Sequence, residues 1–137
     1  SKAGEILEIV GISPDAMGRF PHQFSGGQRQ RICIARAVVM EPKLIVADEA
    51  VSALDVSVQK QVLDLFLDIR KRFGMAMLFI THDLRVAAQV CDRVVVMQHG
   101  KVVEQGITTD VYNNPQHPYT QDLLAAAPGR DVKFNQL

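Results

Sequence analysis

The sequence has no apolar run long enough to cross a membrane. Its longest uninterrupted apolar stretch, residues 75–80, is far shorter than the roughly 20 residues that a membrane-spanning helix needs. The two cysteines, Cys33 and Cys91, stand alone and not in the closely spaced pairs of metal sites. We also find no basic, apolar and small-residue pattern of a secretory signal at the start. These absences favour a soluble protein of a reducing compartment.

The chain also lacks an excess of charge of either sign. Lysine and arginine number 15, and aspartate and glutamate also number 15. A balanced surface gives no overall field that attracts nucleic acid or anionic lipid. Arg29, Arg31 and Arg36 lie on one predicted helix, and we interpret them as a solvated face or a partner contact. We therefore expect no nucleic-acid partner, and any phosphate chemistry must be local.

Apolar periodicity predicts helices and strands in alternation. Helical spacing occurs in residues 2–10, 25–41, 55–73 and 83–91, and short apolar strands in residues 44–47 and 75–80. We expect Gly74 to end the third of these helices and Asp83 to cap the fourth. Such alternation indicates an α/β fold in which helical crossovers join parallel strands. Because residues 44–47 are all apolar, we expect this strand to be central and buried on both faces of the sheet.

The last third of the chain predicts a hairpin followed by two short helices. Two β-rich runs, residues 93–97 and 101–105, are joined by Gln98-His99-Gly100, which favours a tight antiparallel turn at the end of the sheet. After Gly106, we expect Thr108 or Thr109 to cap one helix and Thr120 to cap a second that ends at Ala127.

A serine and two glycines stand at a predicted helix start. Unpaired backbone N–H groups and the helix dipole can hold negatively charged oxygens there, although an ordinary serine-capped turn would use the same residues. The longer run FSGGQRQR, residues 24–31, resembles the signature motif of ABC transporter ATPases. In that family, the serine and glycines of one subunit close over the γ-phosphate of ATP held by the partner subunit. The resemblance implies that ATP is bound by Ser25, Gly26, Gly27 and Gln28.

Two acids, Asp48 and Glu49, follow the predicted strand 44–47. Adjacent residues of an extended chain point to opposite sides, so the two carboxylates can serve different atoms. A strand that ends in two acids can also be the start of a solvated loop. Residues 44–49, LIVADE, resemble the Walker B strand of the same family. The resemblance implies that Asp48 meets Mg²⁺, usually through water, and that Glu49 orients and deprotonates the attacking water.

Two further motifs match the family. Ser52-Ala53-Leu54-Asp55 resembles the D-loop, which crosses the dimer interface, and Asp55 is at the same time a candidate helix cap. The resemblance implies that Ser52 and Asp55 lie at that interface. His82, within Thr81-His82-Asp83, matches the switch histidine, which implies a catalytic hydrogen bond to the γ-phosphate.

The phosphate-binding loop of such ATPases has no counterpart in the sequence. No stretch of the 137 residues matches G-x-x-x-x-G-K-[ST]. The resemblance therefore implies part of a P-loop NTPase domain, namely the later part of an ABC ATPase domain in residues 1–107. Residues 114–124, NPQHPYTQDLL, resemble the extension that follows the ATPase core in dipeptide and oligopeptide importers, so residues 108–137 are predicted to be that extension.

Together these resemblances imply an ATP-binding and ATP-hydrolysing subunit of an ABC importer for peptides, with ATP and Mg²⁺ as cofactors. The implied partners are transmembrane permease subunits and a second ATPase subunit, identical or different, whose ATP-driven dimerisation energises transport. The implied location is peripheral, on the cytoplasmic face of the inner (plasma) membrane. We expect the 137-residue polypeptide alone to be inactive, since it has no phosphate cradle.

Two other functions remain open. A soluble ABC ATPase that acts on DNA or ribosomes would be expected to carry a long coiled-coil insertion or strongly basic extensions, and the sequence has neither. A non-catalytic interaction module would have kept the fold and lost the chemistry. The intact Ser25, Asp48, Glu49 and His82 argue against that second alternative.

Overall fold

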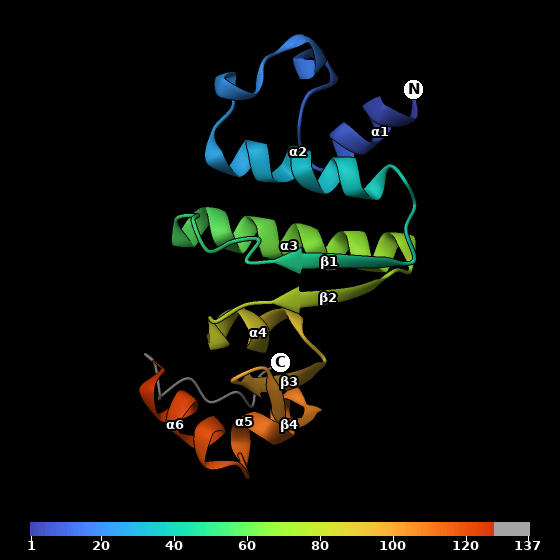
Figure 1. The fold of residues 1–137 in the computed structure, drawn as a ribbon. Coiled ribbons are helices and arrows are strands. Elements are labelled where there is room, and N and C mark those ends of the chain that lie inside the picture. The colour runs from blue at the N-terminus through green and yellow to red at the C-terminus, as the bar shows by residue number, and fades with distance from the viewer. Residues whose placement is uncertain (128–137) are drawn as a thin grey trace. The chain divides into compact units, whose positions relative to one another are not determined.

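A computed structural model describes residues 1–127 of the chain. Contacts divide the chain into two compact units, Ser1–Ile80 and a second that begins at Thr81, and each is described by itself. Figure 1 shows the helices and strands of each unit. Within residues 1–127, no helix combines the length and the apolar character that a bilayer crossing would need.

The first unit is built around a helical crossover between two parallel strands. In chain order, its elements are α1 (Lys2–Ile9), the 3-10 turns η1 (Pro14–Gly18) and η2 (Pro21–Gln23), α2 (Gly26–Val38), β1 (Leu44–Asp48), α3 (Val56–Phe73) and β2 (Ala76–Ile80). β1 and β2 are parallel neighbours, in register from Leu44 opposite Ala76 to Asp48 opposite Ile80. The predicted pair of parallel strands with a helical crossover is therefore confirmed.

Helix α3 forms the centre of this unit. Its apolar side recurs at helical spacing and is buried at Val62, Leu63, Leu65, Phe66 and Ile69. Phe66 meets Phe79 of β2 edge to face, with ring centroids 5.5 Å apart. Helix α2 also packs against α3 (Figure 1). Gly74 ends α3 with a left-handed φ of 61°, which glycine adopts without steric cost, as predicted.

Only one face of the β1–β2 sheet is buried, and this sheet has two strands among the described residues. The prediction that strand 44–47 is central and buried on both faces is therefore wrong. Ile45 and Ala47 point into the core, with 8% and 5% of their surface exposed. Side chains alternate along a strand, so a wholly apolar strand presents apolar groups on both faces, whether or not both are covered. The opposite face has side chains that are about half exposed, namely Leu44, Val46, Leu78 and Ile80.

Arg31 of α2 links the three helices of the first unit. Its Nη1 donates to the backbone oxygen of Val10, directly after α1, at 2.9 Å. Its Nη2 donates to Oε1 of Gln61 on α3 at 3.2 Å. Sequence reasoning missed this role, because the helical pattern shows which residues share a face and not which partner that face meets.

We expect Arg31→Ala to lower the free energy of unfolding by about 1–3 kcal/mol, since it leaves the carbonyl of the fully buried Val10 without this donor. Urea unfolding of the 137-residue polypeptide measures the change. The control is Arg36→Ala, at an exposed position in the last turn of the same helix, for which we expect a change within about 0.5 kcal/mol. Equal effects of the two substitutions would show that the link through Arg31 does not stabilise the unit.

The second unit contains the predicted antiparallel hairpin. Its elements are α4 (Leu84–Val90), β3 (Arg93–Gln98), β4 (Lys101–Ile107), α5 (Thr108–Asn113) and α6 (Pro118–Ala126). Gln98 pairs with Lys101, so His99 and Gly100 form a two-residue turn. Both turn residues have positive φ, 49° and 75°, as the favoured hairpin turns require. The hairpin itself is confirmed, but its predicted place at the end of the β1–β2 sheet is wrong, because β3 and β4 form a separate two-stranded sheet among the described residues.

One face of the hairpin packs on helices from both sides of it in sequence. The buried centre consists of Ala88, Val111 and Tyr112. The apolar side chains packed around this centre are Leu84, Ala87, Val94, Val96 and Leu124. Helices α4, α5 and α6 and strand β3 thus share one small core.

The predicted caps of the last two helices are wrong. Thr108 and Thr109 lie inside α5, and the Thr108 hydroxyl donates to the backbone oxygen of Cys91 at 2.6 Å. His117 caps α6 instead of Thr120, because its Nδ1 accepts the N–H of Tyr119 at 3.1 Å. Pro118 suits the first helical position, which moves the helix start ahead of Thr120 and leaves that residue 2% exposed within the helix.

Glu104 of β4 holds the loop between α5 and α6. Its Oε1 accepts two backbone N–H groups, from Gln116 at 2.7 Å and from His117 at 2.5 Å. Hydrogen bonds to a charged acceptor are among the stronger ones in proteins. The loop that resembles the importer extension is therefore bound directly to the hairpin.

Candidate functional site

The predicted phosphate-binding residues form the N-terminal tip of α2, which we call the α2 tip (residues 25–27). Ser25 Oγ accepts the N–H of Gln28 at 3.2 Å, and Gln28 Oε1 accepts the N–H of Ser25 at 3.0 Å. This reciprocal pair is a capping box, and the predicted serine cap is confirmed. The Ser25 oxygen acts as an acceptor here, so its hydroxyl hydrogen can still be donated. The N–H groups of Gly26 and Gly27 lie in the first turn, where a helix supplies no carbonyl for them.

The two glycines of the α2 tip differ in the space around them. A Cβ atom added to Gly26 would lie 3.7 Å from Leu54 Cδ2, which is an ordinary van der Waals contact. A Cβ atom added to Gly27 would lie 2.6 Å from Cγ1 of Val58, closer than real side chains approach. Gly27 is thus required by packing against α3, whereas the fold has room for a side chain at Gly26.

The two acids lie where the chain leaves β1. Asp48 is the last residue of the strand, and Glu49 follows with a φ of 50°, which is uncommon for residues other than glycine. The Glu49 N–H donates to the Ile80 oxygen at 2.9 Å, and its carbonyl accepts the Ser52 hydroxyl at 3.0 Å. These bonds fix the backbone of Glu49, while both acids are exposed to solvent.

The loop of residues 52–55 connects the acids to the α2 tip. Ser52 bonds back to Glu49, and Leu54 lies beside Gly26. Asp55 is the N-cap residue of α3, as predicted, but its side chain makes no capping hydrogen bond there. The N-termini of α2 and α3 and the C-terminal end of β1 lie at the same end of the unit (Figure 1). Ligands of open α/β sheets commonly bind beyond the carboxyl ends of the strands.

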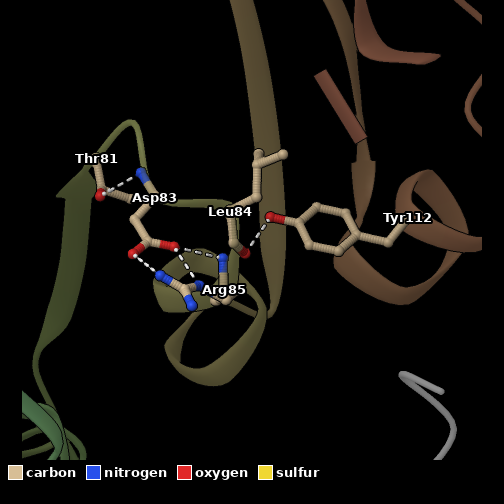
Figure 2. A network of polar contacts seen from close by, with 5 residues as sticks. All are labelled: Thr81, Asp83, Leu84, Arg85 and Tyr112. Atoms are coloured by element: carbon tan, nitrogen blue, oxygen red, sulfur yellow. Dashed lines mark hydrogen bonds and ion pairs between the residues drawn. The ribbon is translucent and has the colours of Figure 1, made fainter. Parts of the chain in front are cut away.

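His82 belongs to the second unit, and it is exposed in the turn before α4. This turn is ordered by its neighbours: Thr81 Oγ1 accepts the N–H of Asp83 at 3.0 Å, and Asp83 Oδ1 caps α4 by accepting the N–H of Arg85 at 2.9 Å (Figure 2). The predicted Asp83 cap is confirmed. The first unit brings together the α2 tip, the acids and the loop of residues 52–55.

Asp83 is held in its ionised form. Burial opposes ionisation of this carboxyl, but the hydrogen bonds and the charge of Arg85 outweigh it, and the pKa of Asp83 lies below its ordinary value. One of these contacts joins Arg85 Nη2 to Asp83 Oδ2 at 3.3 Å. Because the pKa is lowered in the folded state, the contribution to stability is present above the unfolded pKa and is lost as the pH falls through the folded pKa.

Tyr112 supports the same segment from α5, since its hydroxyl donates to the backbone oxygen of Leu84 at 2.9 Å (Figure 2). Burial, and then electrostatic interactions with Cys91 and Asp83, raise the pKa of Tyr112 above its ordinary range. The folded protein thus holds this proton more tightly than the unfolded chain does. Stability is consequently lost as the pH rises above the unfolded tyrosine pKa of about 10.

We expect Tyr112→Phe to lower the free energy of unfolding by about 1 kcal/mol at neutral pH and to remove this part of the alkaline loss. Urea unfolding at pH 7 and at about pH 10 measures both effects. Tyr119→Phe, on α6, is the control and should change stability by less than about 0.5 kcal/mol. The interpretation fails if the two variants behave alike.

Comparison with known proteins agrees with these observations. Residues 1–52 match the family model described as ABC transporter. The chain is 57% identical over 123 residues to the glutathione import ATP-binding protein GsiA of Escherichia coli (strain K12), which covers 90% of this chain and 20% of that protein. It is 52% identical over 131 residues to the protein of the same name from Pectobacterium atrosepticum, with 96% and 21% covered. The chain therefore spans about a fifth of the length of these curated relatives.

Solved structures agree with the fold. An ATP-binding cassette of an ABC transporter in its ADP conformation matches with a TM-score of 0.77 and 26% identity over 91% of this chain and 49% of that one. The protein cbiO1 from Clostridium perfringens, part of the ABC transporter complex cbiONQ, matches with a TM-score of 0.75 and 31% identity over 82% and 45%. The chain has the α/β fold of P-loop NTPases. More specifically, it is part of the ATP-binding domain of an ABC transporter.

Proposed function

We propose that this chain supplies four working segments of the ATP-hydrolysing subunit of an ABC importer: the signature tip, the Walker B acids, the D-loop and the switch histidine. One observation carries the proposal. The α2 tip offers a serine hydroxyl and two first-turn N–H groups, with an exposed glycine beside the loop that follows the two acids. The relatives named as glutathione import proteins support a role in import.

The α2 tip is suited to hold the terminal phosphate of an ATP molecule that a second subunit holds. Ser25 can donate its hydroxyl hydrogen, and Gly26 and Gly27 can donate backbone N–H groups. Gln28 keeps Ser25 in place through the capping box, and its side-chain NH₂ group is left for the nucleotide. The exposed surface at Gly26 lets a phosphate come close to the backbone.

The acids and the histidine complete the proposed catalytic set. The carboxylate oxygens of Asp48 suit Mg²⁺, which prefers oxygen ligands and keeps part of its water shell. Glu49 would orient and deprotonate the attacking water, and the imidazole of His82 would donate a hydrogen bond to the phosphate. Bound MgATP supplies the phosphoryl group that is transferred. The fixed backbone of Glu49 fits a positioning role, because its N–H and carbonyl are both hydrogen-bonded.

The proposed partners follow from the same assignment. Ser52 and Asp55 would face a second ATPase subunit, identical or different, and permease subunits would carry the cargo across the membrane. The protein would act as a peripheral subunit on the cytoplasmic face of the inner (plasma) membrane. We assign residues 1–107 to the ATPase domain and residues 108–137 to the extension of dipeptide and oligopeptide importers, of which residues 128–137 lie outside the described part. Peptides are the proposed cargo.

Co-purification with integral membrane proteins tests the proposal. The complete natural protein, carrying an affinity tag, should be recovered from detergent-solubilised membranes with permease subunits, and ATP hydrolysis should rise when the cargo and its carrier are supplied. A cell that lacks the protein should lose uptake of radiolabelled dipeptides or of glutathione. Recovery without any membrane protein, together with unchanged uptake of both solutes, would overturn the role in import.

We expect the 137-residue polypeptide by itself to show no ATP hydrolysis above background, since its sequence contains no phosphate-binding loop. Phosphate release at millimolar MgATP measures this. The matched sample is the same polypeptide with Glu49→Gln, which should give the same background. Turnover that the substitution abolishes would contradict the prediction and would place a complete site within these residues.

A further inference from the structure

Val58 touches the backbone of the α2 tip from a different helix. A Cβ atom placed on Gly27 would lie 2.6 Å from Cγ1 of Val58 and 4.0 Å from its Cβ. One methyl group of α3 thus occupies the space in which a side chain at position 27 would lie. The capping box of Ser25 and Gln28 is local to α2, and the contact with Val58 joins the tip to the rest of the unit.

Val58 differs from the valine one turn further along α3. Val62 is fully buried in the core of the unit, whereas Val58 is only partly buried and lies one turn closer to the start of the helix. Position 58 fits the apolar spacing of α3, so the pattern alone does not distinguish it from the other apolar residues of that helix. Its contact with Gly27 becomes visible only in three dimensions.

We propose that Val58 is a positioning residue: the size of its side chain sets the separation between the α2 tip and α3, and thereby the place of the hydrogen-bond donors on Ser25 and Gly26. This inference rests on the proposed function, since it concerns the grip of those donors on the phosphate of ATP. Packed protein interiors are nearly incompressible, so an added methylene moves the backbone or the side chain that it meets. A displacement of about 1 Å in a binding group can cost about a hundredfold in rate.

The test uses the complete natural protein with Glu49→Gln, so that bound MgATP is retained and not hydrolysed. The measured quantity is the rate at which radiolabelled MgATP dissociates, followed by rapid filtration. Gly27→Ala should raise this rate at least about tenfold, because the added methyl displaces the tip. Val58→Ala should restore retention in the Gly27→Ala protein to within about threefold of the parent, since it removes the group that the new methyl meets.

The matched control is Val62→Ala in the Gly27→Ala protein, which removes the same methyl groups from the same helix but away from the tip. It should not restore retention. If Gly27→Ala fails to fold, Val58→Ile serves instead: it enlarges the side chain at the contact and should raise the dissociation rate several-fold with little change in the thermal midpoint. Neither result is expected of a residue that only fills the core.

Restoration by Val62→Ala as complete as that by Val58→Ala, or no restoration by either, would overturn the positioning role. Unchanged retention in Val58→Ile would do the same. In both cases the parent Glu49→Gln protein still retains MgATP, so the proposed function is left standing. If that parent retains no MgATP, the proposed function fails and the role of Val58 fails with it.

Discussion

Glu49→Gln is expected to lower the rate of ATP hydrolysis by the complete natural protein by about 10²–10⁴-fold, the usual contribution of a general base. Glutamine has nearly the same shape and can still accept a hydrogen bond from water, but it cannot take the proton. The backbone of residue 49 should stay in place, because its N–H and carbonyl bonds to Ile80 and Ser52 do not involve the side chain. Phosphate release under saturating MgATP gives the rate.

Glu41→Gln is a closely matched control for that experiment. Glu41 is also exposed and also has a φ of 50°, so the same change is made at the same uncommon backbone geometry. Its ion pair with Lys2, at 2.9 Å, is exposed on both sides and contributes little. We expect the hydrolysis rate to stay within about twofold of the unaltered protein, because a surface change of this kind disturbs little. A large loss in both variants, or in neither, would refute the role of Glu49 as the base.

Gly26→Ala is expected to lower the kcat/KM of the complete protein for ATP by about 10²-fold, comparable to the loss of one oxyanion donor. A methyl group at this position has room within the chain, since it would lie 3.7 Å from Leu54 Cδ2. It would instead stand where the phosphate has to approach the first-turn N–H groups. The thermal midpoint of the protein should therefore hardly change while activity falls.

The control for this substitution is Gly4→Ala. Gly4 lies in the first turn of α1, where the cap Ser1 accepts its N–H at 3.3 Å, and an added Cβ would lie 3.6 Å from Ser1 Oγ. The steric surroundings thus match those of Gly26, but no ligand is proposed there. Activity should be unchanged in this variant. A second variant carries bulky residues at both Ser25 and Gly26. If this variant and Gly26→Ala both keep full activity, the α2 tip is not a phosphate site.

Prediction from the sequence succeeded for several features that depend on residues close together in the chain. Ser25 predicts a capped helix because a cap bonds to a residue within one turn, and the structure shows that residue to be Gln28, which completes a capping box. Asp83 caps α4 for the same reason. The hairpin follows from His99-Gly100, two residues that tolerate positive φ between strand-forming runs. These local features also define the α2 tip and the position of the acids at the end of β1.

Sequence analysis was insufficient where a side chain has its partner far along the chain. Thr108 could cap a helix, but it bonds to the carbonyl of Cys91, 17 positions earlier. The contact between Gly27 and Val58 spans two helices, so the packing role of this glycine could not be separated from a role in binding. β1 is buried on a single face because only that face of the sheet is covered. The apolar sequence of the strand does not reveal which faces are covered.

The described part of the importer-like extension is built into the second unit. Val111, Tyr112 and Leu124 belong to the same core as Ala88, and Glu104 binds the loop that precedes α6. A shortened protein that stopped at residue 107 would lack the side chains of α5 and α6 that pack on the hairpin. The Glu104 carboxylate would also lose its two backbone donors. In protein engineering, residues 108–127 should be kept as an integral part of the second unit, and a tag or fusion partner should not replace them.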